Sequence, residues 1–283
     1  MAAASPSLSA RQAQERVAYV SVADEATNQP VPNLGPDAFL IREDGVRREV
    51  LRVTPATSPM PLAVLVDNSQ AMEPSIADLR RGLTAFMTAI DGLGPVTLVT
   101  VADRPTVTLG YTTSLKDMVA AAGRIFHAPT SGATLLDAIS DVSKGLARRE
   151  SDRAGIVAVT GEFTDYSHLL YQDVLADLRA SGASLHAVVL TNPAQSLTTD
   201  EARNRATVLD RGPRESGGVR EDILTSMAFE PTLKDLAARL KSQYRVVYAR
   251  PASLIPPEKI EIGSAKPGLD ARGAPARERA SKP

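Results

Sequence analysis

Polar side chains that could do chemistry follow the apolar run at residues 61–67. This run, PLAVLVD, ends in Asp67, and Ser69 stands two residues further on. An aspartate at the end of a strand can act as a phosphatase nucleophile, but that chemistry needs a second aspartate where this chain has Ser69. A metal-assisted hydrolase built on Asp67 therefore remains only as an alternative, because no base or second nucleophile accompanies it in the sequence.

The composition excludes most other catalytic chemistries. The 283 residues include no cysteine, so disulfides, thiolate zinc sites and thiol catalysis are ruled out. The three histidines, His127, His168 and His186, lack metal-ligand spacing and are expected to be surface or core side chains. No Gly-x-Ser-x-Gly, Walker or Gly-x-Gly-x-x-Gly pattern occurs. We therefore expect a protein that is not an enzyme.

The charge and aromatic content also restrict the partners. Thirty-two Lys and Arg against thirty-three Asp and Glu leave a net charge of −1, which gives no general attraction to nucleic acid or to an anionic membrane. There is no tryptophan, and aromatic residues make up only 4% of the chain, too few for base-stacking platforms. The longest apolar stretches have the length of strands, so we expect neither nucleic-acid binding nor membrane insertion.

Residues 62–250 are expected to alternate between strands and helices, with Asp67 at the end of the first strand. The continuous apolar run at 61–67 predicts a strand, and further strands are predicted at 95–103, 106–111, 154–161, 184–191 and 243–250. Helical spacing of apolar residues predicts helices at 73–91, 115–126, 133–146, 169–180 and 231–241. The alternation predicts an α/β fold with an open, mostly parallel central sheet and helices on both faces, similar to a Rossmann fold.

The remaining segments are expected to be simpler. We predict a disordered leader at 1–16, a small β-unit at 17–53, a linker at 54–61, a polar loop inserted at 192–229, and a tail at 251–283 with one strand at 258–262 and disorder after it. Asp44-Gly45 predicts a tight hairpin within the β-unit. Tyr244 and Tyr248, on one side of the last strand, are expected in the core.

Ligands of such sheets bind beyond the carboxyl ends of the strands. This rule directs attention to Asp67 and Ser69 after the first strand, and to the residues that follow the strand at 154–161. It also points to the loop that leads into the helix at 133–146, where Thr134 stands. We expect these three segments to meet at one edge of the sheet.

Several segments together resemble a known family. They are LAVLVDNSQAM at 62–72, SGATLLDAI at 131–139, DAFLIREDGVRREV at 37–50 and LKSQYRVVYARP at 240–251. Their residues and their order are similar to those of von Willebrand factor A (VWA) domains, and most of all to the bacterial VWFA-related domain family. The resemblance implies the VWA fold over nearly the whole chain.

The resemblance also implies a metal-ion-dependent adhesion site. Its motif places Asp67, Ser69 and Thr134 among the ligands. Mg²⁺ and Mn²⁺ favour oxygen ligands, and Mg²⁺ requires near-octahedral geometry. In the family, a bound metal with an open position can accept a carboxylate from a partner protein.

This chain departs from the metal-site pattern at two positions. Ala71 stands where the family has a second serine, and Gly161 stands where it has an aspartate. Glu162 or Asp165 would have to replace the missing carboxylate. Loss of one hydroxyl and one carboxylate predicts a weak or lost metal site, so we expect no cofactor.

The expected function is therefore a non-enzymatic module for protein–protein interaction, of the adhesion or scaffold type, with another protein as its partner. One alternative is a Mg²⁺- or Mn²⁺-dependent ligand-binding domain that uses Asp67, Ser69 and Thr134. Without metal, Asp67 is expected to brace its loop through backbone amides, and the two hydroxyls to cap helix starts. The family resemblance implies an extracytoplasmic location if an export signal has been removed, and the chain is otherwise expected in the cytoplasm.

Overall fold

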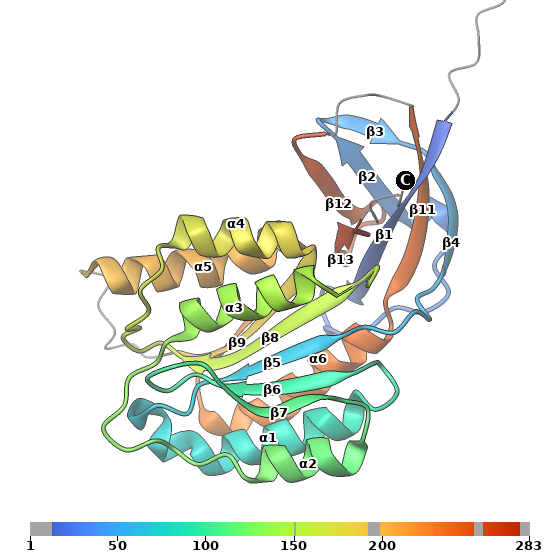
Figure 1. Ribbon diagram of the computed structural model, residues 1–283. Coiled ribbons are helices and arrows are strands. Elements are labelled where there is room, and N and C mark those ends of the chain that lie inside the picture. Colours follow the sequence, from blue (N-terminus) through green and yellow to red (C-terminus); the bar gives the residue numbers. More distant parts are fainter. Residues whose placement is uncertain (1–12, 150, 192–198, 252–256, 278–283) are drawn as a thin grey trace, which may run out of the picture.

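The computed structural model describes residues 13–149, 151–191, 199–251 and 257–277. The larger of its two parts is a layered α/β unit around a six-stranded sheet of order β10-β9-β8-β5-β6-β7 (Figure 1). All strand pairs in this sheet are parallel except β6 with β7. The strands are β5 (Leu62–Val66), β6 (Val96–Thr100), β7 (Thr106–Thr112), β8 (Ala154–Gly161), β9 (Ala183–Leu190) and β10 (Arg220–Ile223). The predicted fold class is confirmed.

Helices cover both faces of this sheet (Figure 1). One face carries α1 (Ile76–Ala89), α2 (Leu115–Gly123) and α6 (Phe229–Lys241). The other face carries α3 (Leu135–Ala147), α4 (Tyr171–Ser181) and α5 (Asp200–Ser216). Short 3-10 helices η1 (Pro36–Ala38), η2 (Gln70–Ser75) and η3 (Ser226–Ala228) complete the set.

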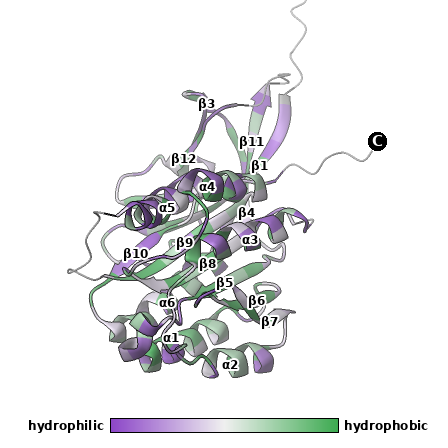
Figure 2. Ribbon diagram, turned by 60° about the vertical axis from the view of Figure 1, so that its left-hand side comes forward, coloured by the Kyte–Doolittle hydropathy of each residue, from purple (hydrophilic) through white to green (hydrophobic). Residues whose placement is uncertain are grey.

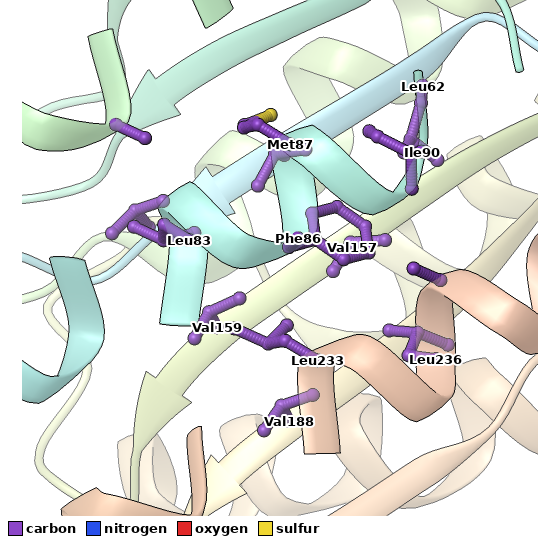
Figure 3. Close-up of a cluster of buried hydrophobic side chains, with 14 of the residues drawn as sticks. Leu62, Leu83, Phe86, Met87, Ile90, Val157, Val159, Val188, Leu233 and Leu236 are labelled. Carbon is purple, nitrogen blue, oxygen red and sulfur yellow. The ribbon is translucent and has the colours of Figure 1, made fainter. Parts of the chain in front are cut away.

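The strands are apolar on both sides because both faces are covered. Val64 packs into the core under α1 and α6, whereas its neighbour Leu65 packs into the core under α3 and α4. Figure 3 shows the first of these cores, where Phe86 of α1 and Leu233 of α6 meet the strands. In Figure 2 the strands are mostly hydrophobic, and the helices alternate hydrophobic and hydrophilic surface.

The second part consists of strands and the short helix η1, and both ends of the described chain contribute to it. A four-stranded sheet has the order β13-β1-β11-β4, and a three-stranded sheet has the order β12-β2-β3. Its strands are β1 (Ala13–Asp24), β2 (Phe39–Glu43), β3 (Val46–Arg48), β4 (Val50–Pro55), β11 (Tyr244–Pro251), β12 (Ile260–Ser264) and β13 (Leu269–Pro275). We call this the β-module.

Two features of the β-module agree with the sequence. Strands β2 and β3 form the predicted hairpin, and Asp44 and Gly45 both take positive φ angles, of 48° and 78°. Such angles are those of a type I′ turn. The side chains of Tyr244 and Tyr248 are buried in the core of the module.

Three predictions about the chain ends are wrong. Strand β11 does not close the six-stranded sheet but pairs with β1 and β4 in the β-module. Residues 13–16, expected in the disordered leader, begin β1. Residues 269–275, expected as disordered tail, form β13 and pair with β1. The partners of β1 lie more than two hundred residues from it and β4 lies nearly two hundred residues from β11, so no local pattern indicates these pairings. Residues 1–12 and 278–283 lie outside the described part.

The predicted polar loop at 192–229 is also wrong over most of its length. Residues 200–216 form helix α5 and residues 220–223 form strand β10, whereas residues 192–198 lie outside the described part. Thr199 caps the helix by accepting a hydrogen bond from the amide of Ala202. Within the described residues, no helix is long and apolar enough to cross a membrane.

The β-module is fixed to the α/β unit by polar contacts. Arg239 of α6 donates to the side chain of Asn28 at 2.7 Å and to Asp270 at 3.2 Å. Arg153, just before β8, donates to the carbonyl oxygen of Ser58 at 2.8 Å and to the side chain of Gln243 at 3.1 Å. Charge-assisted bonds of this kind are stronger than neutral ones, so they hold the two parts in one arrangement.

Candidate functional site

Asp67 lies at the carboxyl end of β5, and its side chain is fully buried. Its Oδ1 accepts hydrogen bonds from the backbone amide of Ser69 at 3.0 Å and from the Ser69 hydroxyl at 2.7 Å. Its Oδ2 accepts a hydrogen bond from the hydroxyl of Thr160, at 2.7 Å, across the sheet on β8. As predicted, Asp67 braces its own loop. The contact with Thr160 was not predicted.

Asp165 lies in the loop after β8 and is also buried. Its Oδ1 accepts from the backbone amide of Ser167 at 3.0 Å, and its Oδ2 accepts from the backbone amide of Leu135 at 3.1 Å. Leu135 is the first residue of α3, so the carboxylate caps this helix from another segment of the chain. The structure thus brings Asp165 to the same edge of the sheet as Asp67.

An arginine from α5 lies between the two carboxylates. The Nη1 of Arg205 donates to Asp165 Oδ2 at 2.7 Å. Its Nη2 donates to the carbonyl oxygen of Gly161 at 2.6 Å and to the hydroxyl of Thr160, and lies 3.6 Å from Asp67 Oδ2. The side chain of Arg205 is only 4% exposed. We call Asp67, Thr160, Asp165 and Arg205 the Arg205 cluster.

The hydroxyls expected as metal ligands or helix caps have other partners. Thr134 stands at the N-cap position of α3, but its hydroxyl donates to the carbonyl oxygen of Val101 at 3.0 Å. Ser69 stands at the N-cap of η2, and its hydroxyl donates to Asp67. Neither side chain accepts a bond from a helix amide, so the prediction that they cap helix starts is wrong. Asp165 caps α3 in place of Thr134.

The two pattern-breaking positions and the other substitute carboxylate can also be located. Ala71 lies in η2 and supplies no side-chain oxygen. At Gly161, an added Cβ would lie 2.3 Å from the ring of Phe163, so no side chain fits there without a shift. Glu162 forms an ion pair with Arg220 of β10, at 3.0 Å. Of the two substitutes considered, only Asp165 enters the cluster around Asp67.

The residues at this edge do not fit a divalent metal ion. A metal needs several free oxygen ligands around one point, and here a guanidinium fills the space between the carboxylates. The hydroxyls of Ser69, Thr134 and Thr160 donate to acceptors of the protein itself. Among the described residues, no group of three or more His, Cys, Asp and Glu side chains is arranged to hold a metal. The cation of this site is Arg205.

Sequence reasoning missed Arg205 because its segment was interpreted as a loop. The buried residues of α5 recur at helical spacing, which is the signal that could have found the helix. They are Ala202, Arg205, Val208, Leu209, Gly212 and Pro213. An arginine within such an apolar stripe needs a buried anionic partner, and it therefore predicts a carboxylate nearby.

Apolar side chains are also exposed at the carboxyl edge of the sheet. Eight large apolar residues are exposed in the described part of the chain, and five of these lie at that edge, in loops or in the short helix η3. The five are Phe126, Tyr166, Leu170, Leu224 and Met227. We call them the apolar rim.

The apolar rim is joined to the cluster through the backbone of its loops. The carbonyl oxygen of Phe126 accepts from the side chain of Asn68, next to Asp67, at 3.0 Å. The amide of Tyr166, next to Asp165, donates to the carbonyl oxygen of Ala133 at 2.7 Å. The positions of Phe126 and Tyr166 therefore depend on loops that lie next to the cluster.

The three histidines do not take part in the site. His127 and His168 lie near Glu73 and Asp137 at the surface, whereas His186 of β9 is buried. The Nδ1 of His186 accepts from the amide of Val219 at 3.3 Å, so the proton is on Nε2, which lies 3.1 Å from the hydroxyl of Ser184. These positions agree with the prediction of surface and core histidines.

Burial and, secondarily, the positive charge of Arg239 lower the pKa of His186 from 6.5 to about 3. The unfolded chain binds a proton below pH 6.5 that the folded chain rejects, so stability falls as the pH falls from 6.5 towards 3. We expect a loss of about 1.4 kcal/mol per pH unit from this group. Urea unfolding at several pH values between 7 and 5 measures this change in unfolding free energy. It should be present in wild type and absent in His186→Gln.

His168→Gln is the matched control for this prediction. The variant removes a histidine whose side chain is 91% exposed and leaves His186 in place, so the loss of stability that His186 causes on acidification should remain. If wild type and His186→Gln lose stability in parallel on acidification, the buried neutral imidazole is not the cause.

Comparison with known proteins supports the fold through structure alone. No protein-family model and no curated protein sequence matches the chain. A von Willebrand factor type A structure from Catenulispora acidiphila superposes with a TM-score of 0.52 at 9% identity, over 96% of this chain and 68% of that one. The conserved hypothetical protein BatB of Bacteroides thetaiotaomicron gives 0.50 at 12% identity, over 65% of this chain and 100% of that one.

A third similar structure is a pilus adhesin, SpaC of Lactobacillus rhamnosus GG. Its TM-score is 0.50 at 12% identity, over 88% of this chain and 48% of that one. At these identities the likeness concerns the fold. The mixed six-stranded sheet with helices on both faces agrees with it. The chain therefore has the fold of a von Willebrand factor A domain, joined to a β-module made from both of its ends.

Proposed function

We propose that this chain is a non-enzymatic protein-binding module whose recognition surface is the carboxyl edge of the six-stranded sheet. The observation that carries the proposal is the apolar rim, because five of the eight large apolar side chains exposed among the described residues lie at that edge. Apolar patches on a surface mark interaction sites, whereas single exposed apolar residues are ordinary, and these five residues share one edge of the sheet. The partner is another protein that buries this rim.

The state of the two carboxylates supports binding over catalysis. Asp67 is fully buried, and both of its oxygens accept hydrogen bonds from the protein itself. Asp165 is held in the same way by backbone amides and by Arg205. A general base or nucleophile has to reach its substrate, and neither carboxylate is offered to one. The hydrolase alternative built on Asp67 loses its reactive group.

The similar structures also support an interaction role. One of them is the pilus adhesin SpaC, which is similar in fold to this chain. The fold alone does not define an activity, so the proposal depends on the rim of this chain.

The test is capture of partner proteins by the immobilised chain from an extract of its own cells. We expect Leu224→Lys/Met227→Lys, which places two charges in the rim, to lower recovery of the captured proteins about tenfold or more. Leu224 is 82% and Met227 70% exposed, so the folded state should tolerate both changes. Quantitative mass spectrometry of the captured proteins gives the recovery.

Val46→Lys is the matched control, because Val46 is 56% exposed but lies on the β-module. It should retain the proteins that the rim variant loses. If both variants lose captured proteins equally, or if neither loses any, the binding surface does not lie at the carboxyl edge.

A further inference from the structure

We infer that Arg205 is a tethered cation that occupies the metal position of this fold, so that the site is permanently filled and closed to divalent metals. The inference rests on the geometry of the Arg205 cluster and does not depend on the proposed function. Its first support is charge. Asp67 and Asp165 are both buried, and two buried carboxylates at one site need a cation between them.

The second support is that one guanidinium contacts two of the three segments that a metal would join and is linked to the third through Asp165. Arg205 contacts Asp165 in the loop after β8, Thr160 and Gly161 at the end of β8, and Asp67 at the end of β5. Through Asp165 it is linked to the start of α3, whose first amide donates to the same oxygen. The planar, multidentate donor geometry of arginine suits this bridging role.

The third support is how the cation is held. A metal ion exchanges with solvent, whereas this guanidinium is covalently part of α5 and its side chain is only 4% exposed. Chelators and changes in metal concentration therefore cannot empty the site. The loops of the carboxyl edge are then held in place by the position of α5, and removal of the guanidinium should expose a pair of carboxylates that a metal can use.

The test compares the melting temperatures of wild type and two variants, each measured with and without millimolar Mn²⁺. Arg205→Ala should melt about 10 °C below wild type. Added Mn²⁺ should raise its melting temperature by several degrees, because the ion binds only the folded state. Wild type should not respond. Arg214→Ala, which removes an exposed arginine of the same helix, should behave like wild type.

Two outcomes would overturn the inference. One is an Arg205→Ala protein that melts with wild type or is indifferent to Mn²⁺. The other comes from wild type itself, and it can be measured even if Arg205→Ala does not fold. Electron paramagnetic resonance should show that wild type leaves the signal of free Mn²⁺ undiminished. A loss of signal that Asp67→Asn restores would show a metal at the position assigned to Arg205.

Discussion

An Arg205→Met variant is expected to unfold with a free energy about 3–5 kcal/mol lower than that of wild type. Methionine replaces the aliphatic part of the arginine side chain but carries no charge. Asp67 and Asp165 are then buried without their cation. The loss of four polar contacts of one guanidinium adds to the penalty, because their acceptors stay buried. Urea unfolding of the purified proteins measures the difference.

Two further variants show whether the loss comes from charge. Arg214→Ala removes an exposed ion pair of α5 with Asp210 and should cost less than about 1 kcal/mol. In Arg205→Met/Asp165→Asn, one of the two buried charges is also gone, so the combined loss should be clearly smaller than the sum of the single losses. Additive losses would mean that Arg205 and Asp165 contribute independently and that the cluster is not a unit.

Gly217→Ala is expected to destabilise the chain by about 3 kcal/mol or more. Gly217 ends α5 with a φ of 76°, where a side chain is strained. In addition, a Cβ at this position would lie 2.1 Å from the carbonyl carbon of Gly273 in β13. Two backbones are in contact here, so no flexible side chain can move away. The change should separate the end of α5 from the β-module.

Gly45→Ala is a closely matched control for this second prediction. Gly45 has nearly the same φ, 78°, but nothing lies within 4 Å of its added Cβ. Its replacement should cost only the backbone strain, about 1 kcal/mol. The difference in unfolding free energy between the two variants therefore reports the contact between α5 and β13. Equal costs would mean that this contact does not matter.

Local sequence patterns predict those strands and helices whose residue types are determined by burial in the core. Strands β5 and β8 are continuous apolar runs because both faces of the sheet are covered, and their sequences show it. The helical spacing of α5 is easy to miss, because its buried face includes Gly212, Pro213 and a charged residue, Arg205. The pairing of β1 with β11 and β13 depends on residues at opposite ends of the chain, which only the folded structure brings together.

The site shows the same limit. The rule that ligands bind at the carboxyl ends of parallel strands leads to Asp67, and the search for a substitute carboxylate leads to Asp165. Their opposite charge comes from a helix that follows β9, on a segment with a high content of acids and arginines. Most arginines of that segment form exposed pairs, as Arg211 and Arg214 do. Arg205 differs from them because it lies on the buried face of α5.

We infer that a guanidinium of the chain itself takes the place of the metal at the carboxyl edge. The most direct measurement is a crystal structure of the wild-type protein grown in millimolar MnCl₂, with diffraction recorded at the manganese absorption edge. We predict guanidinium density between Asp67 and Asp165 and no anomalous peak there. An anomalous peak bound by Asp67, with the side chain of Arg205 displaced, would contradict the account.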